Sequence, residues 1–230
     1  MDNRKLIVTK SNDLIGAGFQ LSLNEQRIIL ACLAQIDSRK PLVTRNIFTV
    51  SVKDFVSTFG TNEKSSYRKL EEAAEALFER TVTKIYGNSL AKIRWLYMVR
   101  YKKDEGMITL GFSPEIAPHL SELNKRFTSY NLSEIANLKS GYSLRLYEML
   151  MQYKELGTLI ISLKEFRGRF ELQNKYSRFF NLKTNVIDIA VKEISDKTDY
   201  EVTCKTIKKG RTITDLHFTF INRVKISKNP

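Results

Sequence analysis

The sequence predicts an α+β fold made of two tandem winged-helix units, each a helix-turn-helix followed by a β-hairpin wing, related by internal duplication. Three observations predict it. A short motif occurs twice, both halves show the same order of helices and strands, and a helix with one polar face precedes a basic hairpin. We expect the two domains to span residues 1–128 and 129–230.

The repeated motif joins a strand to a short helix. Residues 51–55 (SVKDF) match residues 162–166 (SLKEF), and Phe59 and Phe170 follow at the same interval. Each half then runs helix, strand, short helix, turn, long helix and hairpin. A match this short could arise by chance, but the shared order of elements favours duplication.

In the first half, helical and strand periodicities alternate along the chain. A capping-box pair, Ser22 and Glu25, opens the first helix, and a connector that we expect to be mostly helical closes the half. The expected elements are a strand at 5–11, helices at 21–37, 52–59 and 65–80, strands at 48–51, 81–86, 91–102 and 107–112, and the connector at 114–127.

In the second half, the pattern predicts a short helix at 163–171, a long helix at 181–195, and a hairpin with strands at 200–206 and 212–221. At 100° per residue, one side of the long helix is apolar and the other polar. The apolar side holds Val186, Ile187, Ala190, Val191 and Ile194, and the polar side holds Thr184, Asn185, Asp188 and Lys192. We expect Asn181 to be its N-cap.

Polar and basic side chains gather at the start of this helix, at the hairpin turn and at the start of the first long helix. Such groups contact phosphates and base edges of DNA, although amphipathic helices and basic turns often face only water. The candidate DNA-binding residues are Lys175, Tyr176, Arg178, Lys183, Thr184, Asn185, Lys208, Lys209 and Arg211, with Lys64, Ser66, Tyr67, Arg68 and Lys69 in the first unit. The first-unit set is the weaker one, because Glu71, Glu72 and Glu75 follow it.

The formal charge of +13 indicates a polyanionic partner, the alternative being a protein that is merely basic. Two cysteines, Cys32 and Cys204, are too few and too far apart for a disulfide framework or a zinc finger, and we expect both to be reduced core residues. No apolar run is long enough to cross a bilayer, so we expect a cytoplasmic protein.

We expect no catalytic residue, metal or cofactor. Only two histidines, His119 and His217, are present and lie far apart, whereas a DNA-cutting initiator needs paired metal-binding histidines near a nucleophilic tyrosine. Residues 60–65 (GTNEKS) lack the glycine before lysine that a phosphate-binding loop requires. Tyr142 and Tyr147 are interpreted as packing residues.

Residues 138–150 (LKSGYSLRLYEML), with LSLNEQRIILACLAQI, ISLKEFRGRFEL and KKGRTITDLHFTF, resemble the initiator (Rep) proteins of iteron-containing, theta-replicating plasmids. The resemblance implies a bacterial protein with two winged-helix domains that bind direct repeats in origin double-stranded DNA. It also implies origin opening, partnership with the host replication initiator, replicative helicase and chaperones, and a homodimer, formed through the N-terminal domain, that represses the protein's own gene.

In that family, basic side chains around the start of the C-terminal recognition helix read bases. Arg178 and Lys183 keep this character, but Thr184 and Asn185 stand where close relatives can carry arginines, which changes the expected target sequence. The alternatives are a dedicated winged-helix transcriptional repressor, a DNA-processing nuclease or relaxase, and a module that docks protein partners.

Overall fold

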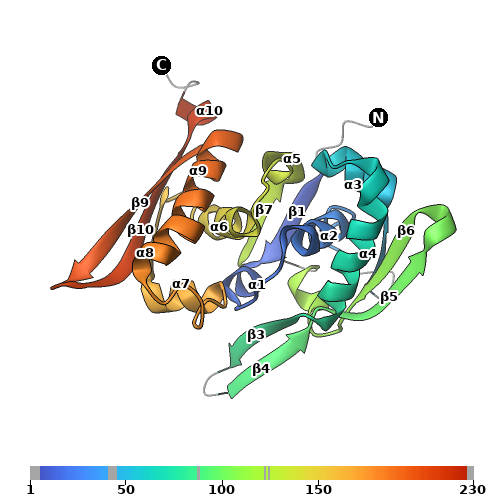
Figure 1. Ribbon diagram of the computed structural model, residues 1–230, viewed down its shortest axis with the longest axis horizontal. Helices are drawn as coiled ribbons and strands as arrows, with labels where there is room; N and C mark the ends of the chain where they lie inside the picture. The colour runs from blue at the N-terminus through green and yellow to red at the C-terminus, as the bar shows by residue number, and fades with distance from the viewer. Residues whose placement is uncertain (1–5, 41–45, 87–88, 122, 124, 227–230) are drawn as a thin grey trace. The chain divides into compact units, whose positions relative to one another are not determined.

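The computed structural model of the protein describes residues 6–40, 46–86, 89–121, 123 and 125–226 (Figure 1). Contacts separate the chain into two compact units, Met1–Asn137 and Leu138–Pro230. The boundary expected between residues 128 and 129 falls inside β7 (Phe127–Asn131), which pairs antiparallel with β1 (Ile7–Ser11). This pairing makes β7 part of the first unit, so the first unit continues past the expected boundary.

The first unit places its helices around three small sheets, with strand orders β2-β6-β5, β3-β4 and β1-β7. Besides β1 and β7, its elements are α1 (Asn12–Gly16), α2 (Leu23–Leu33), β2 (Ile47–Ser51), α3 (Val52–Phe59), α4 (Glu63–Glu79), β3 (Thr81–Tyr86), β4 (Ser89–Arg94), β5 (Leu96–Lys102), β6 (Met107–Phe112) and α5 (Leu132–Ile135). Short 3-10 turns occupy Lys103–Glu105 and Ala117–His119.

The second unit has one three-stranded antiparallel sheet of order β8-β10-β9. Its elements are α6 (Gly141–Met151), β8 (Thr158–Ser162), α7 (Leu163–Arg169), α8 (Phe179–Leu182), a π-helical segment (Lys183–Ile187), α9 (Asp188–Lys197), β9 (Tyr200–Lys209), β10 (Thr212–Asn222) and α10 (Arg223–Ile226). In Figure 1 the long β9–β10 hairpin extends beside α8 and α9.

The two units share one winged-helix topology. In each sheet the last strand, β6 or β10, lies between the first strand and the other wing strand. In each repeated motif a serine hydroxyl caps the short helix: Ser51 accepts from the Asp54 amide and Ser162 from the Glu165 amide. The first unit differs by the additional β3–β4 hairpin, which is inserted between α4 and β5.

The repeated phenylalanines form equivalent core pairs. The rings of Phe55 and Phe59 are 4.9 Å apart and those of Phe166 and Phe170 are 4.5 Å apart, and all four side chains are buried. Such aromatic pairs remove a large apolar area from water. They bury the inner side of each short helix, and Phe166 also packs against Phe218 of β10, with 6.2 Å between ring centroids. Together with the shared strand order, these pairs confirm the predicted tandem winged-helix fold.

Two predictions for elements of the first unit were wrong. The strand expected at 91–102 is two strands in different sheets, because Trp95 and Leu96 are both fully buried and break the alternation of buried and exposed residues. The Trp95 ring instead packs edge-on against Phe19, 5.2 Å between centroids. The connector at 114–127 is not mostly helical: among its described residues the only helical segment is the 3-10 turn that contains Pro118, a residue without a backbone N–H.

Candidate nucleic-acid interface

The long helix of the second unit is continuous from α8 through the π-helical segment to α9. Its N-cap is Arg178, whose carbonyl accepts from the amides of Asn181 and Leu182, so the expectation that Asn181 caps the helix was wrong. The predicted apolar face is confirmed for Val186, Ile187, Ala190 and Ile194, each at most 1% exposed, whereas Val191 is half-buried. Arg178 is exposed beside the first turn.

The π-helical segment carries three of the candidate residues, Lys183, Thr184 and Asn185, all exposed. The Thr184 hydroxyl donates to the Phe180 carbonyl at 3.0 Å, and the Asn185 amide donates to the Asn181 carbonyl at 2.9 Å. Both side chains therefore lie along the helix surface rather than into the core.

Lys183 already has an anionic partner. Its Nζ lies 2.7 Å from both carboxylate oxygens of Asp188, five residues further on. A π-helix brings residues i and i+5 together, so this pairing follows from the local helix geometry. The lysine and the aspartate therefore offset each other's charge on the exposed face.

A single arginine holds the loop between α7 and α8. The Arg167 guanidinium donates to the carbonyls of Leu172 (3.1 Å), Lys175 (2.9 Å), Tyr176 (2.7 Å) and Ser177 (3.4 Å). This network fixes the loop that carries the candidates Lys175, which is exposed, and Tyr176, which is half-buried with a positive φ of 54°. Sequence analysis missed Arg167. Its position in the last turn of the helix before the loop was the available signal.

Glu193 holds α9 against the start of α6. Its two carboxylate oxygens accept from the backbone amides of Lys139 and Ser140 at 2.8 and 3.1 Å. Burial alone would raise the pKa of Glu193, but hydrogen bonds from Lys197, Ser143 and Lys139 outweigh it and hold that pKa below its ordinary value. Glu193 thereby anchors the end of the long helix, while Arg167 fixes the loop that leads into its start.

The wing of the second unit ends in a basic tip. Lys208, Lys209 and Arg211 are all exposed, and none has an ion-pair partner in the part of the chain that the structure describes. Gly210 has a φ of 63°, the value that a two-residue hairpin turn requires at its first position. The turn therefore presents three uncompensated cations at the end of β9 and β10.

The first-unit candidates differ from one another in accessibility. Ser66 is only 2% exposed, and its hydroxyl hydrogen-bonds with the Asn62 carbonyl and the Thr61 hydroxyl, so its expected DNA contact is not supported by this geometry. The Tyr67 hydroxyl is also buried. Arg68 and Lys69 are exposed, and the side chain of Lys64 lies outside the described residues.

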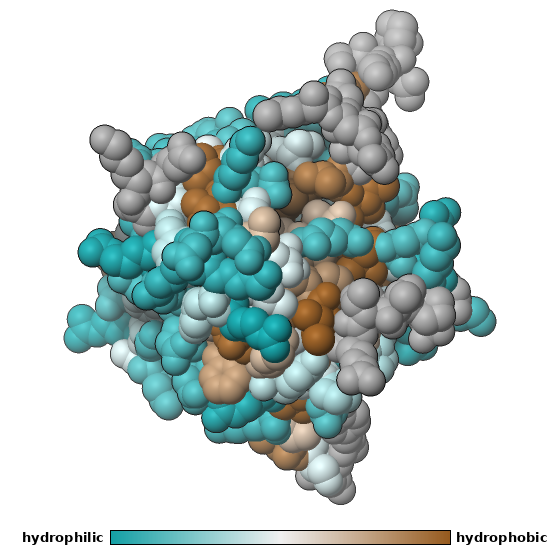
Figure 2. All heavy atoms as spheres, turned by 90° about the vertical axis from the view of Figure 1, so that its right-hand side faces the viewer, coloured by the Kyte–Doolittle hydropathy of each residue, from teal (hydrophilic) through white to brown (hydrophobic). Residues whose placement is uncertain are grey.

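Three acidic residues of α4, Glu71, Glu72 and Glu75, have basic or hydroxyl partners. Glu72 is 3.5 Å from Arg68, and Glu71 is 3.5 Å from Lys103. Glu75 accepts from the Tyr101 hydroxyl at 2.6 Å, and burial together with this carboxylate raises the pKa of Tyr101. The face around α4 and the β5–β6 wing is mostly hydrophilic, with smaller hydrophobic patches (Figure 2).

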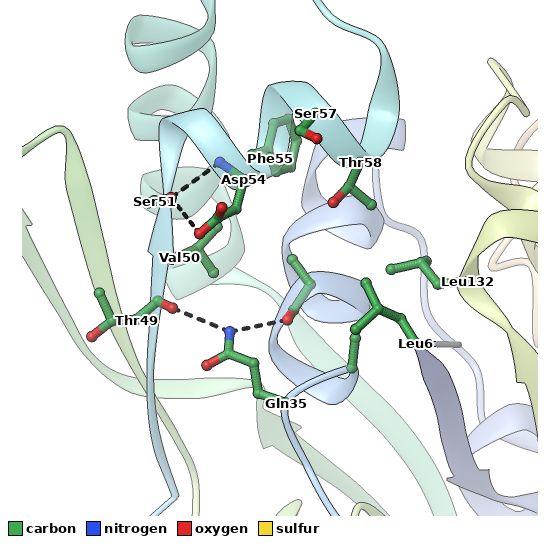
Figure 3. A pocket seen from close by; sticks show the side chains of 12 residues that line it. Leu6, Gln35, Thr49, Val50, Ser51, Asp54, Phe55, Ser57, Thr58 and Leu132 are labelled. Atoms are coloured by element: carbon green, nitrogen blue, oxygen red, sulfur yellow. Dashed lines mark hydrogen bonds between the residues drawn. The ribbon is translucent and has the colours of Figure 1, made fainter. Parts of the chain in front are cut away.

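A pocket of about 440 Å³ opens in the first unit between α2, β2 and α3 (Figure 3). Gln35 crosses one side of it, donating to the carbonyls of Ala31 and Thr49 at 3.0 and 3.1 Å. Among the described residues that line it, the only carboxylate is that of Asp54, which accepts from the Ser51 hydroxyl. The described residues of the lining contain neither histidine nor cysteine.

Both histidines are engaged within their own units. Lys84 donates to His119 Nε2 at 2.7 Å, so Nδ1 carries the ring proton and donates to the Ser11 hydroxyl at 2.8 Å. Burial, and then the charge of Lys84, lower the pKa of His119. His217 Nε2 hydrogen-bonds with the Thr158 hydroxyl at 2.8 Å. Within the described residues, no group of three or more histidine, cysteine or acidic side chains is placed to hold a metal ion.

Both cysteines are free thiols, but only Cys32 is a core residue. Burial raises its pKa, and burial followed by the charge of Asp188 raises the pKa of the half-exposed Cys204 to about 12. None of the helices in the described part of the chain has the length and apolar composition needed to cross a bilayer.

Comparisons with known proteins match both units. Residues 7–151 match the family described as Initiator Replication protein, WH1, and residues 162–220 match Initiator Rep protein, WH2. The chain is 27% identical to the PI protein of Escherichia coli, over 95% of this chain and 84% of that protein. It is 29% identical to a replication initiation protein of the same species, over 93% of this chain and 69% of that protein. The solved structure of the Pi initiator protein in complex with iteron DNA superposes with a TM-score of 0.82 at 25% identity, covering 96% of this chain and 98% of that one.

Proposed function

Because the chain belongs to the family of replication initiator (Rep) proteins with two winged-helix domains, we propose that it binds direct repeats, called iterons, in double-stranded DNA of a plasmid origin. The observation that carries this proposal is the long helix of the second unit. Its apolar face is buried, while Arg178 and the segment Lys183–Asn185 are exposed beside a basic wing. In a winged-helix protein such a helix enters the major groove and the wing lies along the flanking backbone.

The second unit supplies most of the sequence discrimination in this proposal. Arg178 can donate two hydrogen bonds to guanine, Asn185 can pair with adenine, and the Thr184 methyl can contact a thymine methyl. The exposed cations of the wing tip, Lys208, Lys209 and Arg211, contact phosphates and place the helix in register.

The first unit contributes fewer base contacts. Arg68 and Lys69 are exposed near the start of α4 and suit phosphate contacts, with Lys64 as a further candidate, whereas Ser66 and Tyr67 are turned into the unit. From the family resemblance, we also assign to this unit dimerisation of the free protein, with repression of its own gene by the dimer.

Binding of both units to a repeat array would distort the duplex and help to melt a neighbouring AT-rich segment. The proposed partners are then the host replication initiator and replicative helicase, with chaperones acting on the dimer. No step in this mechanism breaks a covalent bond, and both histidines, the residues that a metal-dependent DNA-cutting initiator would use, hydrogen-bond within their own units.

The test is fluorescence anisotropy of the purified protein with duplexes tiled from the DNA upstream of its own gene, beside a scrambled duplex. Tight binding to tiles that contain direct repeats, weakened steeply by salt, is expected because each neutralised phosphate releases counterions. Equal binding to all tiles would leave only a general affinity for DNA. Strand cleavage on adding Mg²⁺ would point instead to a DNA-processing enzyme.

A further inference from the structure

Phe180 is an aromatic residue on the surface of the proposed DNA-reading helix. Its side chain is 73% exposed, more than any other large hydrophobic side chain in the described residues. Single exposed hydrophobic residues are common on protein surfaces, so exposure alone carries no function. The position of Phe180 does indicate a function, because Phe180 lies in the first turn of α8 among the candidate DNA-binding residues.

The helix holds Phe180 on the outside. Two other residues of this turn supply its inner side: Leu182 is fully buried and Phe179 is half-buried, whereas Asn181, next to Phe180, is also exposed. The backbone is fixed by the Arg178 carbonyl, which accepts from the amides at the next turn, and by the Thr184 hydroxyl bound to the Phe180 carbonyl. Phe180 cannot turn into the core without unwinding this end of the helix.

The neighbours of Phe180 are those of a DNA-facing residue. Thr184 follows four residues later and therefore lies on the same side of the helix. Arg178 precedes it and Lys183 follows it, so the aromatic ring lies between two basic residues that would approach the DNA phosphates. If the helix enters the major groove, Phe180 enters with it, and its apolar ring then leaves water.

The major groove offers one apolar group on its base edges, the 5-methyl group of thymine. We propose that Phe180 contacts this methyl group and makes the protein specific for thymine at one position of its binding site. This inference rests on the proposed function and adds a specificity-determining contact to the same helix. It accounts for the placement of a large apolar side chain among candidates that, apart from the methyl group of Thr184, offer only hydrogen bonds and charge.

The test removes the methyl group and the ring separately. In a duplex that carries the direct repeat, each thymine is replaced in turn by deoxyuridine, which lacks only the 5-methyl group. At one position the wild-type protein is expected to bind about three- to fivefold more weakly, from the usual gain on burying one methyl-sized group. The variant Phe180→Ala is expected to bind the thymine duplex more weakly and to lose the difference between thymine and deoxyuridine at that position.

Three further variants make the result specific. Phe180→Leu keeps an apolar side chain and is expected to retain part of the thymine preference. Thr184→Ser removes the other methyl group on this side of the helix while keeping the hydroxyl, and is expected to retain the preference at the Phe180 position. Leu156→Ala removes an equally exposed apolar side chain, 71% exposed, from the loop between α6 and β8 and is expected to change nothing.

Two outcomes overturn the inference alone: a wild-type protein that prefers the repeat but tolerates deoxyuridine at every position, or a Phe180→Ala variant that keeps the full preference for thymine. A wild-type protein that binds repeat and scrambled duplexes equally would overturn the proposed function together with this inference. Because Phe180 is exposed, its variants should unfold at the wild-type temperature, which circular dichroism verifies.

Discussion

We expect the ion pair between Lys183 and Asp188 to restrain DNA binding and the variant Asp188→Asn to release that restraint. Lys183 Nζ lies 2.7 Å from both oxygens of Asp188, and both side chains are about half exposed. To reach a phosphate or a base, Lys183 must leave this carboxylate, and the carboxylate itself repels the DNA. Asparagine keeps the shape of residue 188 and removes its charge.

The size of the effect follows from the exposure of the pair. Exposed ion pairs contribute about 0.2–1 kcal/mol. Because the variant does not have to break this ion pair when it binds DNA, its dissociation constant should be about 1.4- to fivefold lower. One additional phosphate contact would also steepen the dependence of log K on log salt concentration by about 0.9. Repeat and scrambled duplexes should gain alike, because a lysine bound to phosphate carries no sequence information.

The assay is a salt titration of binding anisotropy with both duplexes. Asp196→Asn is the matched control, since Asp196 is an exposed carboxylate on the same helix with no ion-pair partner among the described residues. If Asp196→Asn tightens binding as much, the gain is general electrostatics rather than release of Lys183. If Asp188→Asn weakens binding to the repeat alone, Asp188 accepts a hydrogen bond from a base, and the restraint that we describe does not exist.

Three further predictions concern what holds the interface in place. Arg167→Lys keeps the positive charge but loses the guanidinium group that binds four loop carbonyls. It should lower the free energy of unfolding, measured in urea, by about 2–3 kcal/mol. The control variant Lys164→Ala on the same helix should leave that free energy unchanged. Glu193→Gln weakens two charge-assisted bonds to the start of α6 and should cost about 1–3 kcal/mol in the same assay; an unchanged midpoint would show that these bonds do not fix α9. The pKa of His119 in the folded protein lies below its ordinary value of 6.5, so its contribution to stability is present above pH 6.5 and is lost as the pH falls below that value. The variant His119→Gln should therefore flatten the plot of unfolding free energy against pH in this range. Parallel plots for the variant and the wild type would contradict this assignment.

Local patterns carried most of the fold prediction. The serine caps at Ser51 and Ser162 and the phenylalanine pairs that follow them are set by spacing within a few residues, so both short helices were predicted closely. The buried face of the long helix was likewise readable from its period. The strand at 91–102 failed because the alternation around Trp95 looked regular, although the chain crosses there between two sheets.

The parts of the candidate site that sequence analysis missed depend on tertiary contacts. A π-helical segment leaves no mark in the residue pattern, yet it sets the pairing of Lys183 with Asp188. Ser66 looked like a surface residue at a helix start, but the turn before it folds over its hydroxyl. Arg167 binds backbone carbonyls, whose positions the sequence does not reveal, so its place in the last turn of α7 was the one available signal.

The division of labour between helix and wing is the central claim, and the ratio of affinities for repeat and scrambled duplexes tests it most directly. Arg178→Ala should lower the affinity for the repeat by about 1–3 kcal/mol and reduce the ratio, because it removes a contact to a base. Lys209→Ala should weaken both duplexes alike and leave the ratio unchanged, because it removes a contact to phosphate. Equal losses on both duplexes for both variants would contradict the claim that the long helix of the second unit reads the sequence.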